Sequence, residues 1–283
     1  MISSYIELTK PRILLMVLIT EAIGFFLGAR GVVMWQPFVV AMVGTGLSCA
    51  GAAALNHYLE RDVDSRMKRT CRRPLPIGDI EPQSALIFGI CLVLAGVSLL
   101  VAKVNLLTGF LSLLTAFLYV LVYTPLKRVT WLNTFVGAIP GALPPMGGWA
   151  AATGSLDLGA WILFLILFIW QHPHFYSIAW MYREDYSRGG FKMLPVVEPD
   201  GGSTFRQIII YSLLLIPVSL VPCFLGMSGS IYGWGAFVLG MLMLWSGIVL
   251  LRTHQVSDAR RLLRVSIIYL PLLLILIISD VKF

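Results

Sequence analysis

The chain has 283 residues, of which 58% are hydrophobic and only 12% are charged. Soluble globular domains carry about 25% charged residues, so this sequence has too little charge to cover a soluble surface. Because a membrane-spanning helix needs about 20 residues, the length predicts a single transmembrane domain, residues 1–283, with about eight or nine helices. The formal charge of +7 lies in short segments between apolar stretches, which favours a lipid bilayer and an anionic substrate and excludes nucleic acid as the expected partner.

Nine apolar stretches in chain order predict nine membrane helices in an all-α fold. The first follows Lys10 and Arg12, as a signal peptide would, but the many later spans favour an uncleaved first helix. The predicted spans are approximately residues 13–29, 37–58, 84–102, 106–123, 132–151, 158–181, 207–227, 232–251 and 265–281.

The basic residues predict how the chain crosses the membrane. With the N-terminus inside, 18 of the 21 Lys and Arg residues lie in inside segments, and only Arg30, Lys103 and Lys282 lie outside. The positive-inside rule therefore predicts a cytoplasmic N-terminus and cytoplasmic loops after the second and sixth spans. No transit peptide is recognisable, which favours a prokaryotic plasma membrane.

Those two inside loops share a pattern. One reads ERDVDSRMKRTCRRPLPIGDIEP and the other YREDYSRGGFKMLPVVEPDGG. Each begins with acids at a helix end, continues through basic residues and reaches a Leu-Pro. Because their parent helices are four spans apart and point the same way, we expect two four-helix halves with a ninth helix appended.

The strongest chemical signal is a row of oxygen-bearing side chains at the inner end of the second span. Asn56, Glu60 and Asp64 are spaced i, i+4 and i+8, which places them on one helix face. Carboxylate and amide oxygens are ligands that suit Mg²⁺, which often shares substrate phosphates. A solvated helix end is the alternative, but acids at the mouth of an apolar bundle favour a functional site.

Basic residues follow this row. Five of them lie within eight residues and a sixth follows the fourth span; they are Arg66, Lys68, Arg69, Arg72, Arg73 and Lys127. Positive-inside topology alone is the competing explanation. Their density beside the acids favours a diphosphate-binding cleft, because arginine and a metal ion together neutralise phosphate oxygens.

A second cluster lies in and after the sixth span. His172 and His174 flank Pro173, which removes a backbone hydrogen bond and favours a kink at a cavity. Ionisable side chains within a membrane span are by default functional candidates. Asp185, eleven residues after His174, returns to nearly the same helix face and is predicted as a second metal ligand.

At the asparagine and acid row the sequence resembles a known family. NHYLERDVDSRMKRTCRRPLP is similar to the first Asp-rich motif of the UbiA superfamily of intramembrane prenyltransferases. TKPR at residues 9–12, QHPHF at 171–175 and DYSRGGFKMLPVV at 185–197 resemble its haem-farnesylating branch. The resemblance covers nearly the whole chain. It departs from the general superfamily pattern at His57, where most members have an acid, and this leaves the number of metal ions open.

The resemblance implies a UbiA-like fold, farnesyl diphosphate and haem B as substrates, haem O as product and Mg²⁺ as cofactor. It implies catalytic and metal-binding roles for Asn56, Glu60, Asp64 and Asp185. It also implies that a haem A synthase or a terminal oxidase assembly is a partner. One or both histidines of QHPHF would contact haem, and the role of Glu21, inside the first span, stays open between a proton relay, a polar lining and a haem-propionate neighbour.

Three other functions remain as alternatives. A sister enzyme would prenylate an aromatic or quinone-precursor acceptor, but it would not need the histidines. A transporter would use intramembrane charges without requiring an Asn-x3-Glu-x3-Asp row beside five basic residues. A haem-binding structural protein would use the histidines but not the acids.

Overall fold

The computed structural model describes residues 2–282, and their regular structure is helical except for one isolated bridge between Ser228 and Val281. The all-α fold class is therefore confirmed. The helices are α1 (Ile2–Leu8), α2 (Pro11–Gly28), α3 (Trp35–Asp64), α4 (Pro82–Lys103), α5 (Leu106–Phe117), the π-helix η1 (Leu118–Tyr123), α6 (Thr124–Leu126), α7 (Asn133–Thr153), α8 (Leu158–Met181), α9 (Arg183–Arg188), α10 (Leu194–Val197), α11 (Gly202–Phe224), α12 (Ser230–Thr253) and α13 (Val256–Ser279).

Nine of these segments have membrane length within the described chain. Eight are both long and apolar enough to cross a membrane, with α5, η1 and α6 forming one continuous span, Leu106–Leu126. The ninth is α7, whose 21 residues include six glycines and prolines in the stretch Pro140–Gly148 and are less apolar. The predicted nine spans are thus present. The protein is a multi-pass integral membrane protein.

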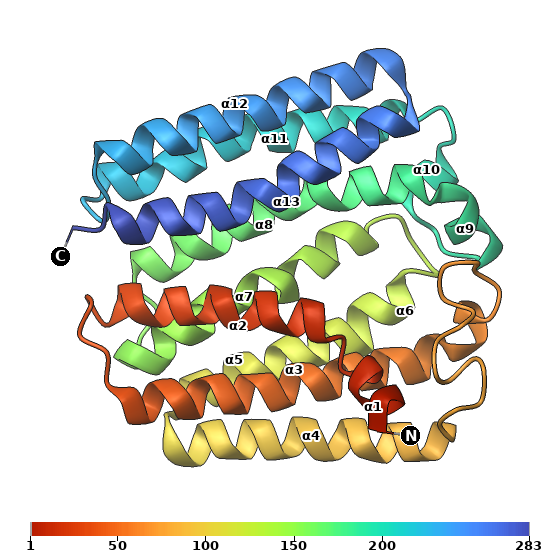
Figure 1. Ribbon diagram of the computed structural model, residues 1–283, viewed down its shortest axis with the longest axis horizontal. Helices are drawn as coiled ribbons and strands as arrows, with labels where there is room; N and C mark the ends of the chain where they lie inside the picture. Colours follow the sequence, from red (N-terminus) through yellow and green to blue (C-terminus); the bar gives the residue numbers. More distant parts are fainter. Residues whose placement is uncertain (1, 283) are drawn as a thin grey trace.

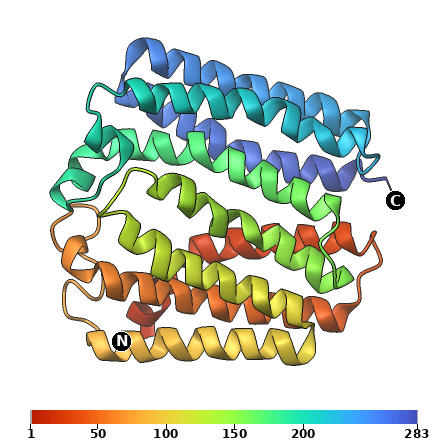
Figure 2. The same ribbon diagram turned by 180° about the vertical axis from the view of Figure 1, so that it is seen from behind.

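The membrane helices pack as two groups of four with one helix between them (Figures 1 and 2). The first group contains α2, α3, α4 and the α5–α6 span, and the second contains α8, α11, α12 and α13. The sequence predicted that the last helix would be the extra one. In the structure α13 closes the second group, and α7 lies between the groups, against α2, α5 and α8.

Glycine explains why α7 takes this central place. A Cβ added at Gly148 would collide with the backbone carbonyl of Glu21, and one added at Gly24 would collide with that of Pro145. The backbones of α2 and α7 therefore touch directly, as small residues allow between membrane helices.

The functional loops lie at one end of the bundle. Figure 1 shows the N-terminus, the loop between α3 and α4, and helices α9 and α10 at this end, with the C-terminus at the opposite end. The α3–α4 loop packs against the segment after α8 through a cluster of buried apolar side chains: Val63, Met67, Ala179, Phe191 and Met193. The two loops that share a sequence pattern are thus in contact.

Candidate active site

The row on α3 is buried inside the loop-bearing end of the bundle. Asn56 and Asp64 are 0% exposed and Glu60 is 4% exposed. The helix extends to Asp64, six residues beyond the predicted end at residue 58, because its backbone hydrogen bonds continue past the apolar stretch. All three side chains therefore belong to one regular helix, and the i, i+4, i+8 spacing applies to them.

Each carboxylate of the row pairs with a cation from another segment. Lys127 Nζ, just after α6, lies 2.7 Å from Glu60 Oε1. Arg73 Nη1, in the α3–α4 loop, lies 2.7 Å from Asp64 Oδ2. Buried charges are costly unless they are paired and hydrogen-bonded, so these partners allow the acids to be ionised at this depth.

Lys10 completes the cluster from a third direction. Its Nζ donates to Asn56 Oδ1 at 2.5 Å and to the Tyr119 hydroxyl at 3.2 Å. Asn56 Nδ2 in turn donates to Thr124 Oγ1 at 2.9 Å. Lys10 adopts a left-handed backbone conformation (φ 50°) directly before Pro11, which is unfavourable for a residue with a Cβ.

The pKa values of the two lysines in the cluster, Lys10 and Lys127, shift in opposite directions. Burial lowers the pKa of Lys10 to about 7, and the positive charges of Arg73 and Lys127 act in the same direction. Burial alone would lower the pKa of Lys127 too, but the adjacent Glu60 carboxylate outweighs it and raises that pKa above its ordinary value. The Glu60 carboxylate therefore stabilises the charged form of Lys127.

The row has the donor chemistry that Mg²⁺ requires. Asp64 Oδ1 is buried and has no hydrogen-bond partner, which leaves one carboxylate oxygen free for a cation. Within residues 2–282 no three His, Cys, Asp or Glu side chains gather closely enough to hold a metal alone. An asparagine, two carboxylates and substrate phosphates form a set that fits Mg²⁺, which is commonly bound by one or two carboxylates together with phosphate.

Asp185 lies on α9, outside the α3 row, and its carboxylate accepts hydrogen bonds from backbone N–H groups. Its Oδ1 accepts from the backbone N–H of Lys68 at 2.9 Å, and its Oδ2 accepts from that of Arg69 at 3.2 Å. Arg188 Nη2 also donates to Oδ1, at 2.5 Å. Burial acts to raise the pKa of Asp185, but these donors outweigh it and hold the pKa below its ordinary value.

The predicted basic residues separate into two sets. Arg73 and Lys127 reach the acid row directly. The side chains of the others are exposed on the α3–α4 loop; they are Arg66, Lys68, Arg69 and Arg72. The Arg69 guanidinium lies over the rings of Tyr182 and Tyr186, at 5.5 and 5.8 Å from their centroids.

The two histidines are in the second helix group and face different neighbours. His172 is fully buried, stacks on Tyr211 of α11 at 3.7 Å between ring centroids, and uses Nδ1 to bond the Phe168 carbonyl at 2.7 Å. His174 Nδ1 bonds Ser266 Oγ of α13 at 2.8 Å. The Nε2 atom of His172 is buried without a hydrogen-bond partner. Neither histidine bonds to the α3 row.

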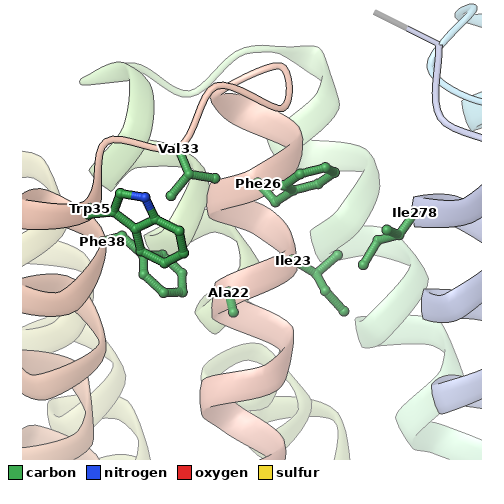
Figure 3. Close-up of a pocket in the computed structure, with 7 residues that line it drawn as sticks. All are labelled: Ala22, Ile23, Phe26, Val33, Trp35, Phe38 and Ile278. Carbon is green, nitrogen blue, oxygen red and sulfur yellow. The ribbon is translucent and has the colours of Figure 1, made fainter.

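An apolar hollow is remote from these groups. Figure 3 shows it between the C-terminal half of α2, the start of α3 and the end of α13, lined by Ala22, Ile23, Phe26, Val33, Trp35, Phe38 and Ile278, with a volume of about 220 Å³. Phe26 follows Lys10 by 16 residues, about 24 Å along the helix. The seven residues that line it are all apolar.

Sequence reasoning missed Lys10 as a site residue. The feature that could have identified Lys10 is its position in TKPR, directly before Pro11 at the start of a membrane span. A side chain at this position can turn back toward the bundle. It also missed Thr124, because a hydroxyl group at a span end is common and carries no distinctive spacing.

The chain belongs to the UbiA prenyltransferase family, whose model matches residues 17–270. It is 50% identical over 285 residues to the protoheme IX farnesyltransferase of Solibacter usitatus, covering 98% of both chains. It is 47% identical to the protein of that name from Salinibacter ruber, covering 99% of both. The recognised superfamily and the UbiA-like fold class are therefore confirmed.

Solved structures share the fold. A digeranylgeranylglyceryl phosphate synthase matches with a TM-score of 0.84 at 18% identity, covering 99% of this chain and 98% of that one. A UbiA homolog from Archaeoglobus fulgidus bound to GPP and Mg²⁺ matches with a TM-score of 0.68 at 16% identity, covering 97% and 99%.

Proposed function

We propose that the protein transfers the farnesyl group of farnesyl diphosphate to a vinyl group of haem B, with addition of water, giving haem O and diphosphate. The relatives named protoheme IX farnesyltransferase, at 47–50% identity over nearly the full length, support the substrates. The observation that carries the chemistry is the buried row Asn56, Glu60 and Asp64, faced by three cations at one end of a membrane bundle.

The row is the proposed diphosphate end of the site. Asn56, Glu60 and Asp64 would hold Mg²⁺, which when bound neutralises charge on the diphosphate oxygens. The solved UbiA homolog bound to GPP and Mg²⁺ supports this cofactor. Lys10, Arg73 and Lys127 come from three different segments, and their positive charges stabilise the charge that grows on the departing diphosphate.

The reaction breaks the farnesyl C1–O bond, the π bond of the haem vinyl group and one O–H bond of water, and it forms one C–C bond and one C–O bond. The farnesyl C1–O bond breaks, and both electrons leave with the diphosphate. The terminal carbon of the haem vinyl group bonds to C1, water adds its oxygen to the inner vinyl carbon, and the water proton is released. The apolar bundle protects the allylic cation from premature capture by water.

The second helix group supplies the proposed acceptor side. His172 and His174 lie on α8 near the proline of QHPHF, and His172 Nε2 is buried with no partner. Either ring can orient the porphyrin or contact its iron. The proposed partners, a haem A synthase or a terminal oxidase assembly, would take the product.

The proposed orientation places the N-terminus, both functional loops and the acid row in or beside the cytoplasm of a prokaryotic cell. The bias of Lys and Arg toward that side supports it. Reporter fusions test it: a fluorescent protein fused at the N-terminus should fold and fluoresce, and a phosphatase fused at the C-terminus should be active outside the membrane.

A direct assay tests the function. Detergent-solubilised protein is incubated with haem B, farnesyl diphosphate and Mg²⁺, and the pigments are analysed by mass spectrometry. A farnesyl-hydroxyethyl haem that disappears in Asp64→Ala supports both the reaction and the diphosphate site. Prenylation of an aromatic acceptor without any haem adduct would overturn the acceptor and move the chain to a sister activity.

A further inference from the structure

His57 is a buried polar side chain to which the proposed reaction has so far given no role. It lies on α3 directly after Asn56 and is 2% exposed. Both of its ring nitrogens, Nδ1 and Nε2, are buried without a hydrogen-bond partner. Buried polar groups are nearly always hydrogen-bonded, and leaving one unpaired is costly. An imidazole with both nitrogens unpaired therefore indicates a site for a group that supplies the missing partner.

Helical geometry places His57 beside the acid row. Because 3.6 residues form one turn, residues seven apart lie within about 20° of each other around the helix axis, so His57 is nearly in line with Asp64. Asp64 Oδ1 is also buried without a partner. Among the described residues of α3, the buried side-chain atoms that lack a partner are His57 Nδ1, His57 Nε2 and Asp64 Oδ1. The unpaired polar atoms of α3 thus share one side of the helix.

The charges around His57 favour an anion as the missing partner. The positive charges of Lys10, Arg73 and Lys127, the same cations that contact the row, all act on its ring. A metal ion fits less well, since within residues 2–282 no three His, Cys, Asp or Glu side chains gather closely enough to hold one. Mg²⁺ also prefers oxygen ligands to imidazole. An imidazole N–H is a donor, and so it complements the oxygens of an anion.

We propose that His57 is a substrate-binding residue whose ring N–H donates a hydrogen bond to an oxygen of the diphosphate group, on the side of the row where Lys10 and Arg73 lie. This deepens the proposed function and rests on it for the identity of the anion. The ring binds the diphosphate oxygens both in farnesyl diphosphate and after the C1–O bond has broken. Inorganic diphosphate alone is therefore a sufficient probe of the contact.

Calorimetric titration of the intact, detergent-solubilised chain with inorganic diphosphate and Mg²⁺ tests the proposal without haem and without turnover. His57→Leu removes both ring nitrogens and should raise the Kd for diphosphate about tenfold, because a hydrogen bond to a charged group is lost. His57→Gln keeps an N–H donor and should stay within about threefold of the parent.

His254→Asn is the matched control. His254 is exposed at the end of α12, away from the acid row, and its left-handed backbone conformation (φ 55°) is one that asparagine tolerates. This variant should bind diphosphate as the parent does.

Nuclear magnetic resonance of the parent protein with isotope-labelled histidine covers the case in which His57→Leu fails to fold. The chain has four histidines, and the signals of His57 are those that His57→Gln lacks. Addition of inorganic diphosphate and Mg²⁺ should shift a ring nitrogen signal of His57 and leave those of His254 in place.

Three results would overturn the proposal. The first is an unchanged Kd for diphosphate in His57→Leu, or no shift of the His57 signals in the parent. The second is weaker binding of Mn²⁺ to His57→Leu in the absence of diphosphate, measured by electron paramagnetic resonance, which would make His57 a metal ligand. The third is weaker haem binding with unchanged diphosphate binding, which would assign the ring to a haem propionate. If the parent makes no haem adduct, the proposed function fails, but the diphosphate titration still reports on His57.

Discussion

The first helix group pairs buried carboxylates with cations at its loop-bearing end, whereas the second places two hydrogen-bonded histidines on α8. In the first, Glu60 and Asp64 each face a cation from another segment. In the second, His172 and His174 each make one hydrogen bond and stack on aromatic rings. A buried ionised carboxylate is stabilised by an opposite charge, whereas an imidazole is satisfied by hydrogen bonds. The ion pairs of the first group fit the proposed diphosphate site, and the histidines of the second group fit the proposed haem side.

The largest expected effect comes from breaking an ion pair of the first group. Lys127→Met leaves the Glu60 carboxylate buried without its partner, and we expect a loss of about 3 kcal/mol in the free energy of unfolding. Denaturation of the purified protein in detergent measures it. The double variant Glu60→Gln/Lys127→Met should recover at least half of the loss; an additive loss would contradict the pairing.

The next effect concerns catalysis. Asp64→Asn should lower the turnover rate about 100-fold at saturating haem, equivalent to ~2.7 kcal/mol, because a neutral amide holds a cation less well than the free carboxylate oxygen. Product formation followed by mass spectrometry measures it. Asp62→Asn is the matched control, since the Asp62 side chain is 70% exposed at the same helix end. Equal losses in both variants would show a general charge effect.

The contact between α2 of the first group and the central helix α7 can be tested at neighbouring glycines of α7. Gly148→Ala places a methyl group against the backbone carbonyl of Glu21 and should destabilise the protein by about 2 kcal/mol. Gly147→Ala meets nothing closer than Glu21 Oε1, at 4.0 Å, and should be nearly neutral. Thermal unfolding of both variants compares them. A similar loss in both would mean that helix flexibility, and not the close approach of α2, sets the requirement for glycine.

The smallest expected effect distinguishes the binding of haem from the binding of farnesyl diphosphate. His172→Ala should raise the KM for haem about tenfold, ~1.4 kcal/mol, and leave the KM for farnesyl diphosphate unchanged. Initial rates with each substrate varied in turn measure this, with His174→Ala as the comparison and haem spectra as a second readout. A change confined to farnesyl diphosphate would break the assignment of the two groups to two substrates.

Local sequence patterns predicted much of this molecule. The apolar stretches located all nine membrane-length segments, and helical periodicity placed Asn56, Glu60 and Asp64 on one face, because both depend on spacing along a single helix. The predicted spans were less accurate at their ends, as at Asp64, since a helix does not stop where the apolar composition stops.

Other features depended on contacts between distant segments. The close approach of Gly148 to Glu21 places α7 directly against α2, which the repeat pattern of four plus four helices with a ninth appended did not specify. Lys10 looked like an ordinary basic residue at a span start until the fold brought it to Asn56 across 46 positions.

The sequence by itself determined that this chain is an all-α membrane protein with an acid row and a basic loop at one end, because composition, periodicity and charge bias are properties of local segments. Only the tertiary structure decided which cation meets which acid, and that Asp185 accepts the N–H groups of Lys68 and Arg69. Except for the pair of Arg73 and Asp64, these contacts join residues more than 60 positions apart in the sequence. They follow from how the helices pack, which no single segment encodes.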